Sequence, residues 1–255
     1  MALFTDSYIS SIAELQAYDS AILEVARIEG VDLSSKLSVA DRELGLELQA
    51  FLLRHAQSGS GDRDGGGYGL QHVVVTSGLQ QWHTLKTLAL VYGDVYNNQL
   101  NDRYLGKWNQ FVRIAKQASE LLFQTGIGVV DNPLPRAIQP QLSVAPSGPP
   151  ANTHIVAVAW RNYRGETGAS SLPKVHTTGD GESLIIKAVQ PPRGAVAFDV
   201  YVGAAEPELG RQNAHPVQIG DSWTLEAQPL TEFDPPSAGQ IPDRYLRLTR
   251  ALQRG

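Results

Sequence analysis

The sequence contains no cysteine, which excludes disulfide frameworks and thiolate metal sites and is compatible with a reducing compartment. It has no apolar run of the roughly 18 residues that a membrane-spanning helix needs. Its start, Met-Ala-Leu-Phe-Thr-Asp, lacks the basic and apolar segments of a secretory signal peptide. We therefore expect a protein that is made and kept in solution, without a membrane partner.

Motifs for catalysis and cofactor binding are also missing. The glycine-rich stretch from Gly59 lacks the Lys-Ser/Thr ending of a phosphate loop, and position twelve counted from Asp62 is Val73, where a calcium loop needs glutamate. The six histidines include no pair at i, i+4, and no Gly-x-Ser-x-Gly elbow occurs. We therefore expect that the protein is not an enzyme and binds neither a cofactor nor a metal ion.

The composition indicates a folded protein whose partners are proteins. Hydrophobic residues make up 42% of the 255 residues, enough for real cores. The net charge of −5 argues against extensive coating of nucleic acid, although a local basic patch stays possible.

A change of pattern divides the chain. Six prolines lie within residues 132–150, and because proline disrupts the interior of a helix, no helix is expected there. Before them the apolar residues have helical period, and after them short β-type runs alternate with Gly, Pro and Asp. The pattern predicts an α+β protein with a helical bundle over 1–137, a β-sandwich over 138–236 and a docking tail with a short helix over 237–255.

Steps of three and four between apolar residues predict about four helices: Tyr8 to Gly30, Ser38 to His55 with Ser38 and Asp41 as caps, Thr76 or Ser77 to Tyr96, and Asn101 to Gly126. The last two form either a tight hairpin or one bent rod. They carry the expected helical core: Trp82, Leu85, Tyr92, Tyr96, Tyr104, Trp108 and Phe111. Apolar residues off the main stripes could pack in the same core or join subunits: Leu46, Leu53, Leu90 and Val91.

Seven short strands are predicted beyond the prolines, the density of a β-sandwich. They run over Ile138 to Val144, His154 to Asn162, Ser171 to His176, Ser183 to Val189, Ala197 to Val202, Pro216 to Ile219 and Ser222 to Glu226. Phe198, Val200 and Val202 alternate with Asp199 and Tyr201, which predicts a half-buried strand. Both phases around Trp160 are apolar, so the inward face of that strand stays open.

Two segments are candidates for contact with partners. Residues 57–70 are rich in glycine, which loses much conformational entropy when it is ordered, so we predict a mobile loop. Its candidate contact residues are Asp62, Arg63, Asp64 and Tyr68. Residues 243–255 carry four arginines against one aspartate and read as a cationic amphipathic helix. Such a tail suits an acidic, partly apolar groove on a partner, or it packs on its own helices.

Several stretches together resemble the head-to-tail adaptor (connector) proteins of tailed bacteriophages. They are Glu14-Leu-Gln-Ala-Tyr-Asp-Ser20, Glu29-Gly-Val-Asp-Leu33, the run from Trp82 to Leu90, and Tyr96 to Tyr104 with Lys107-Trp108. The second part is similar to the fibronectin type III or Ig-like modules of some phage structural proteins, through Trp160 to Ser170 and Phe198 to Gly203. The shorter adaptors lack an inserted sandwich.

The resemblance implies a dodecameric ring of identical subunits in the virion neck, made in the host cytoplasm. The ring would bind the portal protein above and a tail or nozzle protein below, with the glycine-rich loop facing the channel or the tail. DNA would pass through without sequence-specific binding. The tail would dock on the portal through Arg244, Tyr245, Arg247, Leu248, Arg250, Leu252 and Arg254.

Two competing interpretations stay open. In the first, the sandwich is the working part and recognises a partner or a host glycan, which exposed aromatic residues on one sheet face would favour: Trp160, Tyr163 and Trp223. In the second, the protein is an enzyme, which would need a pocket with convergent carboxylates or histidines of shifted pKa.

Overall fold

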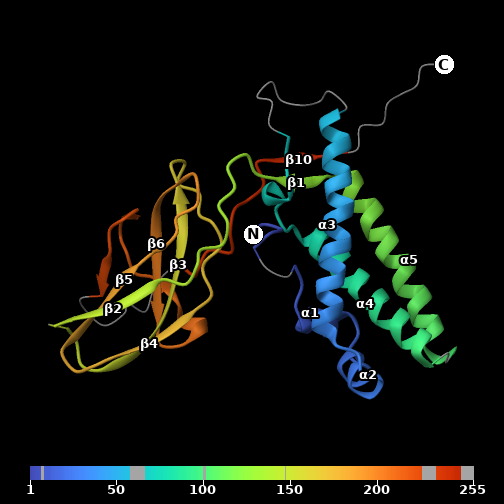
Figure 1. The fold of residues 1–255 in the computed structure, drawn as a ribbon, viewed down its shortest axis with the longest axis horizontal. Helices are drawn as coiled ribbons and strands as arrows, with labels where there is room; N and C mark the ends of the chain where they lie inside the picture. The colour runs from blue at the N-terminus through green and yellow to red at the C-terminus, as the bar shows by residue number, and fades with distance from the viewer. Residues whose placement is uncertain (7–8, 58–66, 100–101, 147, 226–233, 248–255) are drawn as a thin grey trace. The chain divides into compact units, whose positions relative to one another are not determined.

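The computed structural model describes residues 1–6, 9–57, 67–99, 102–146, 148–225 and 234–247. It is a mixed α+β protein in which helices fill the first half and antiparallel sheets the second (Figure 1). The chain forms two compact units. The helical unit is Ser7–Val130 with Pro242–Gly255, and the β unit is Met1–Asp6 with Asp131–Ile241.

Most of the β unit, residues Asp131–Ile241, is thus an insertion in the helical unit, which the chain leaves after Val130 and re-enters at Pro242. From the sequence we predicted boundaries at 137/138 and 236/237. Residues Met1–Asp6 also belong to the β unit, where the Asp6 carboxylate accepts a hydrogen bond from the Arg136 backbone N–H (2.8 Å). Their membership was not foreseen.

The described residues contain five α-helices: α1 (Ile12–Tyr18), α2 (Ile22–Glu29), α3 (Leu33–Gln57), α4 (Ser77–Gln99) and α5 (Asp102–Thr125). Where one helix was expected over residues 8–30, the chain breaks at Asp19, whose backbone is extended and whose carboxylate accepts from the Ala21 N–H. Ser11 and Glu14 form a capping box at the start of α1. The predicted end at Gly30 agrees with its left-handed φ of 67°.

Helix α3 begins five residues before the predicted start at Ser38, so the proposed cap by Ser38 and Asp41 is wrong. The Asp32 carboxylate instead accepts a hydrogen bond from the Ser34 N–H (3.0 Å). Leu33 and Leu37 are buried and extend the apolar stripe of this helix toward its N-terminus.

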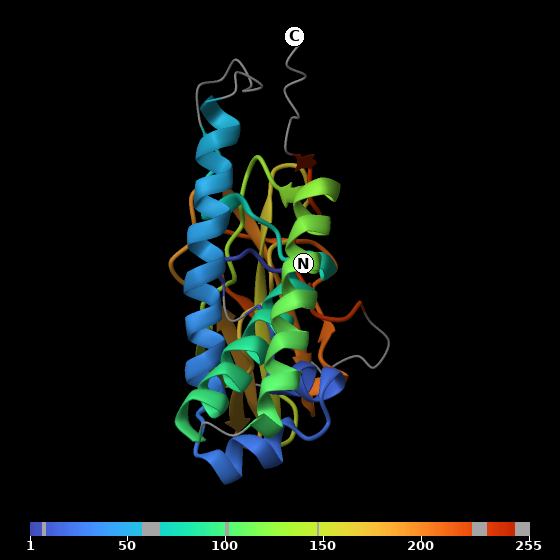
Figure 2. The ribbon, with the colours of Figure 1, turned by 90° about the vertical axis from the view of Figure 1, so that its right-hand side faces the viewer.

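Helix α4 lies between α3 and α5 and is buried on almost every side (Figures 1 and 2). Its buried hydroxyls donate to the carbonyl one turn earlier, as Thr84 does to Gln80 O and Thr87 to His83 O. Helices α4 and α5 pack against each other as a hairpin, with Tyr92 stacked on Phe111 (5.5 Å between ring centroids). The alternative of one bent rod is therefore excluded.

Asp19 ties the α1–α2 corner to this hairpin. Its buried carboxylate accepts hydrogen bonds from the Tyr92 hydroxyl (2.5 Å) and the Lys107 ammonium (2.6 Å). Burial disfavours the charged carboxylate, but the hydrogen bonds of Lys107 and Tyr92 and the charge of Lys107 outweigh it. They hold the pKa of Asp19 below its ordinary value of 3.8.

We expect Asp19→Asn to lower the free energy of unfolding by about 1–3 kcal/mol at neutral pH, because the buried Tyr92 hydroxyl and the more exposed Lys107 ammonium lose their charged acceptor. A lowered pKa in the folded state stabilises the protein above pH 3.8, and this contribution is lost as the pH falls further. The difference between wild type and variant should therefore shrink below about pH 4 in urea unfolding at a series of pH values.

Asp94→Asn is the matched control, since the Asp94 side chain, which pairs with Lys36, is 40% exposed, whereas that of Asp19 is 6% exposed. It should cost less than about 1 kcal/mol. A loss for Asp19→Asn that is equally large at low pH would mean that the carboxylate charge is not what stabilises the corner.

The tail returns to the helical unit as a strand. Strand β10 (Arg244–Leu246) pairs antiparallel with β1 (Ile127–Val129). The helix that we expected from Asp243 is therefore wrong over residues 244–246. The fully buried β1 needs a partner for its open edge, and Leu246 opposite Ile127 adds a buried apolar side chain.

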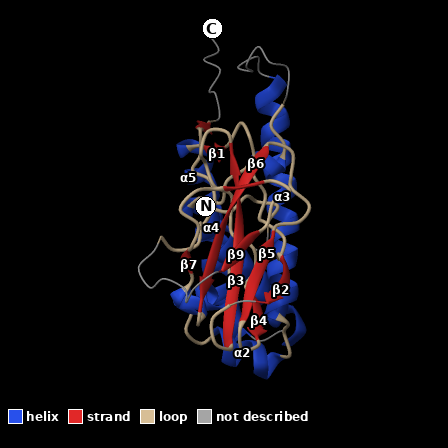
Figure 3. Ribbon diagram, turned by 90° about the vertical axis from the view of Figure 1, so that its left-hand side faces the viewer, coloured by secondary structure: helices blue, strands red, loops and turns tan. Residues whose placement is uncertain are grey.

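Two antiparallel sheets build the β unit (Figure 3). One has the order β2-β5-β9, the other β4-β3-β6-β7, with β8 also paired to β6. Their bounds are β2 Gln141–Pro146, β3 Asn152–Asn162, β4 Lys174–Thr178, β5 Glu182–Lys187, β6 Ala195–Gly203, β7 Gly210–Arg211, β8 Val217–Gln218 and β9 Trp223–Leu225. The seven predicted strands all have a counterpart, and β7 was not predicted.

The two sheets share one apolar core. Val158, Trp160 and Phe198 from one sheet pack with Leu184 and Ile186 from the other. A smaller cluster lies on the opposite face of β3 and β6, formed by Ala157, Ala159, Tyr201 and Leu209. The central strands are therefore buried on both faces, which corrects the prediction of a half-buried strand over 198–202 and explains the apolar residues on both phases of β3.

Candidate interaction surfaces

The described part of the predicted docking tail is anchored to the helical unit. The Arg247 guanidinium donates from Nε to the carbonyl of Thr125 at the end of α5 (3.0 Å). The Tyr245 side chain is 52% exposed, and the Arg244 guanidinium lies 5.8 Å from the centre of the Tyr68 ring. Leu248, Arg250, Leu252 and Arg254 lie outside the described residues.

This contact joins the two segments that the sequence singled out separately. Tyr68 is half-buried, and its ring packs edge-on against His72 (5.6 Å) as well as under Arg244. A cation over an aromatic face contributes about 0.5–1 kcal/mol at an exposed site. The other loop candidates, Asp62, Arg63 and Asp64, lie outside the described residues.

The residues expected in the helical core lie on α4 and α5. Five of them are at most 5% exposed: Trp82, Leu85, Tyr92, Tyr104 and Phe111. Tyr96 and Trp108 are partly buried and stack on each other at 5.5 Å. The Trp108 ring lies directly over Gly93, where an added Cβ would come within 2.9 Å of its Nε1.

Helices α3, α4 and α5 enclose a groove of about 320 Å³ with a charged flank and an apolar flank. On α3, Glu43 and Glu47 both pair with Lys86, at 2.9 and 3.6 Å. Burial lowers the pKa of Lys86, but the two carboxylates outweigh it and raise the pKa above its ordinary value. On α5, Trp108 and Val112 supply apolar surface, and Val112 is 46% exposed.

A separate apolar row lies along the surface of α3. Leu46 is 69% exposed and Leu53 is 57% exposed, and the exposed Ala50 lies between them at helical spacing. The sequence named both leucines as candidates for joining subunits, together with Leu90 and Val91. Val91 is fully buried, and Leu90 is half-buried and lines the groove. We call Leu46, Ala50 and Leu53 the α3 row.

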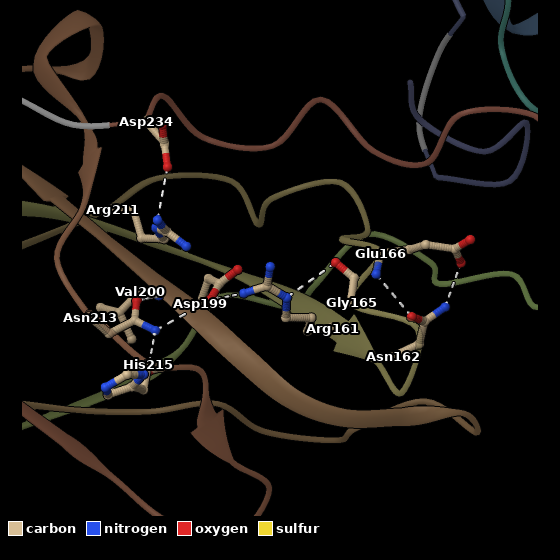
Figure 4. Close-up of polar contacts among 10 residues, drawn as sticks. All are labelled: Arg161, Asn162, Gly165, Glu166, Asp199, Val200, Arg211, Asn213, His215 and Asp234. Atoms are coloured by element: carbon tan, nitrogen blue, oxygen red, sulfur yellow. Dashed lines mark hydrogen bonds and ion pairs between the residues drawn. The ribbon is translucent and has the colours of Figure 1, made fainter.

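A polar network lies on the face of the β3–β6 pair that points away from the core between the sheets (Figure 4). The buried Asp199 carboxylate accepts from Asn213 Nδ2 (3.2 Å) and pairs with Arg161 Nη1 at 3.4 Å. Asn213 also accepts from the Val200 N–H (2.7 Å) and donates to the His215 carbonyl (2.9 Å). These hydrogen bonds link strands β3 and β6 to the segment that contains Asn213 and His215, so the network has a structural role.

The network continues into the segments that cover this face. Asn162 donates to the Glu166 carboxylate (2.6 Å), and Arg211 pairs with Asp234 at 2.9 Å (Figure 4). Burial, followed by the charge of Asp199, raises the pKa of Tyr201 to about 12, so its hydroxyl stays protonated. No sequence pattern indicated this cluster, because the segments that bury it come from distant parts of the chain.

The aromatic residues that would favour a binding module are not displayed together. Trp160 is 2% exposed, and Trp223 packs partly buried against the core between the sheets. Tyr163 is 69% exposed, with the Arg164 guanidinium beside its ring. The observation that would support glycan recognition is therefore missing for this set.

Two other kinds of site are absent from the described residues. Among these residues, no group of three or more His, Asp or Glu side chains is arranged so that it could hold a metal ion. None of the helices in these ranges combines the length and hydrophobicity that a membrane crossing requires. Comparison with models of known protein families and with curated proteins finds no match to this chain.

Proposed function

We propose that this chain is a structural, non-enzymatic head-to-tail adaptor of a tailed bacteriophage. In this proposal identical subunits form a ring that joins the portal to the tail, and DNA leaves the capsid through its centre. The observation that carries the proposal is the α3 row, because a helix that buries one stripe in its own unit exposes two leucines on another.

A ring requires two different surfaces on each subunit that fit each other, so that the contact repeats and closes. The α3 row is one such surface. The groove between α3 and α5 is a second, with exposed Val112 at its apolar flank. We infer that the row of one subunit packs into the groove of the next.

For the β unit we propose a fibronectin type III or Ig-like sandwich. Two antiparallel sheets with a shared core around Trp160 support this assignment, as does the pairing of β3 with β6 across the β4 and β5 segment. As an insertion between β1 and β10, it can extend from the ring without interrupting the helical unit. Its proposed role is to decorate and stabilise the neck.

The tail is the proposed portal contact. Strand β10 and the Arg247 bond to Thr125 fix its base, and the sequence beyond carries two further arginines alternating with leucines. An arginine-rich segment with apolar residues suits an acidic and partly apolar cleft on the portal.

Ending the chain after Arg247 should leave the fold intact and abolish portal binding. This end keeps the buried Leu246 and the bond of Arg247 to Thr125, so β10 is preserved. Co-sedimentation with portal particles measures the binding, and circular dichroism checks the fold. The full-length double variant Arg250→Gln and Arg254→Gln separates the contribution of charge from that of the leucines.

Unchanged co-sedimentation of the shortened protein would overturn the proposed role of the tail. The proposed ring is tested independently by negative-stain imaging of the purified protein with and without its portal. Solitary molecules in both samples would overturn the adaptor assignment itself.

A further inference from the structure

Two histidines of the β unit lie side by side across adjacent strands. His154 of β3 is the register partner of His176 of β4. Directly opposed residues in an antiparallel pair have Cβ atoms about 4.5–5.5 Å apart and project from the same face. Val156, two residues along β3, belongs to the core between the sheets, so this pair projects from the inner face.

The imidazoles of this pair lack the hydrogen bonds that buried polar groups normally make. His154 is 1% exposed. Within the described ranges, neither of its ring nitrogens has a partner, and neither does Nε2 of His176. Buried polar atoms without a partner are rare in folded proteins, so three in one pair point to a ligand that these nitrogens hold.

His83, another buried histidine of this chain, differs from the pair in that its Nε2 has partners, whereas its Nδ1 has none among the described residues. Its Nε2 lies 3.0 Å from the Asp41 carboxylate and 3.3 Å from the Leu37 carbonyl. The two ring nitrogens of His154 and Nε2 of His176 have no such carboxylate or carbonyl contact among the described residues. Burial, followed by the charge of His176, lowers the pKa of His154.

We propose that His154 and His176 bind one late first-row divalent metal ion, of which Zn²⁺ is the reference, across strands β3 and β4. Neutral imidazole is a preferred ligand of Zn²⁺, Ni²⁺ and Cu²⁺, whereas Mg²⁺ and Ca²⁺ prefer oxygen. The Cβ separation lets both rings reach one ion at the usual distance of about 2.0–2.1 Å. His176 is only half-buried, which leaves an approach for the ion and for water in the remaining positions.

The test is zinc titration of the tag-free, full-length protein by calorimetry, with Mg²⁺ as the comparison ion. We expect one Zn²⁺ per chain and no Mg²⁺ binding. Loss of an outer-shell partner alone costs about 10–100-fold in metal affinity, so removal of one of two direct ligands in His176→Gln should cost about 100-fold or more. His215→Gln, which removes an exposed imidazole of the same unit, should bind as wild type.

Zinc binding that is unaffected by His176→Gln, or no saturable binding by the folded wild-type protein, overturns the proposal. Circular dichroism establishes whether the variant is folded. If it is not, imidazole nitrogen spectra of the wild type decide: added Zn²⁺ must shift the ring signals of His154 and His176. Shifts confined to other histidines overturn the proposal.

Discussion

Trp160→Ala is expected to lower the free energy of unfolding of the β unit by about 3–5 kcal/mol, the usual cost of truncating a fully buried tryptophan. Trp160 is 2% exposed and packs edge-on against Phe198, with ring centroids 6.3 Å apart. It belongs to the core that both sheets share, so its loss removes contacts across the two layers. The cavity left behind adds to the lost transfer free energy.

The measurement must separate the two compact units, because a chain of two units need not unfold in one step. Urea unfolding followed by hydrogen exchange in β3 and β6 reports on the β unit, and exchange in α4 reports on the helical unit. Tyr163→Ala is the matched control, since Tyr163 is 69% exposed. It should change the free energy of unfolding by no more than about 0.5 kcal/mol. Equal midpoints for both variants would place Trp160 outside the core.

Local sequence signals predicted most of the helices and strands. The apolar stripes of α4 and α5, with their polar junction, gave both helices to within a few residues. Alternation and turn residues gave the positions of β3, β5 and β6. These signals succeed because the periodicity of burial follows directly from the geometry of one helix or one strand.

The elements that were missed depend on distant partners. The pattern of arginines and apolar residues over 244–247 is compatible with a helix as well as with a strand. The strand that pairs with this segment, β1, lies far earlier in the chain. The burial of Asp199 and Tyr201 depends on later segments, such as Asp234, whose carbonyl accepts from the Arg211 N–H. No local pattern encodes either pairing.

The candidate surfaces could be predicted only in part. Leu46 and Leu53 stood out because they lie off the buried stripe of α3, and both are exposed. Val91 stood out for the same reason and is fully buried, because α4 is covered on nearly all sides. A position off the main stripe is a surface position only where a helix has a solvent face, which depends on the neighbouring helices.

Leu46→Arg combined with Leu53→Arg is expected to abolish ring assembly while leaving the subunit folded. Both side chains are more than half exposed, so the substitutions should change the free energy of unfolding by about 0.5 kcal/mol or less. In the proposed ring, each contact between subunits would bury two guanidinium groups against the apolar flank of the groove. An unpaired charge taken out of water costs several kcal/mol, and the cost recurs at every contact around the ring.

Native mass spectrometry and negative-stain imaging of the protein with its portal measure assembly. Ile28→Arg is the control, because Ile28 is 62% exposed on α2, away from both the α3 row and the groove. Rings with Ile28→Arg and single subunits with the double variant would assign the contact to the α3 row. Because Glu43 and Glu47 flank the groove and can pair with an introduced cation, the double variant Leu46→Glu and Leu53→Glu, which these carboxylates repel, is the stricter form of the test. Rings that persist with both double variants would mean that subunits join through another surface.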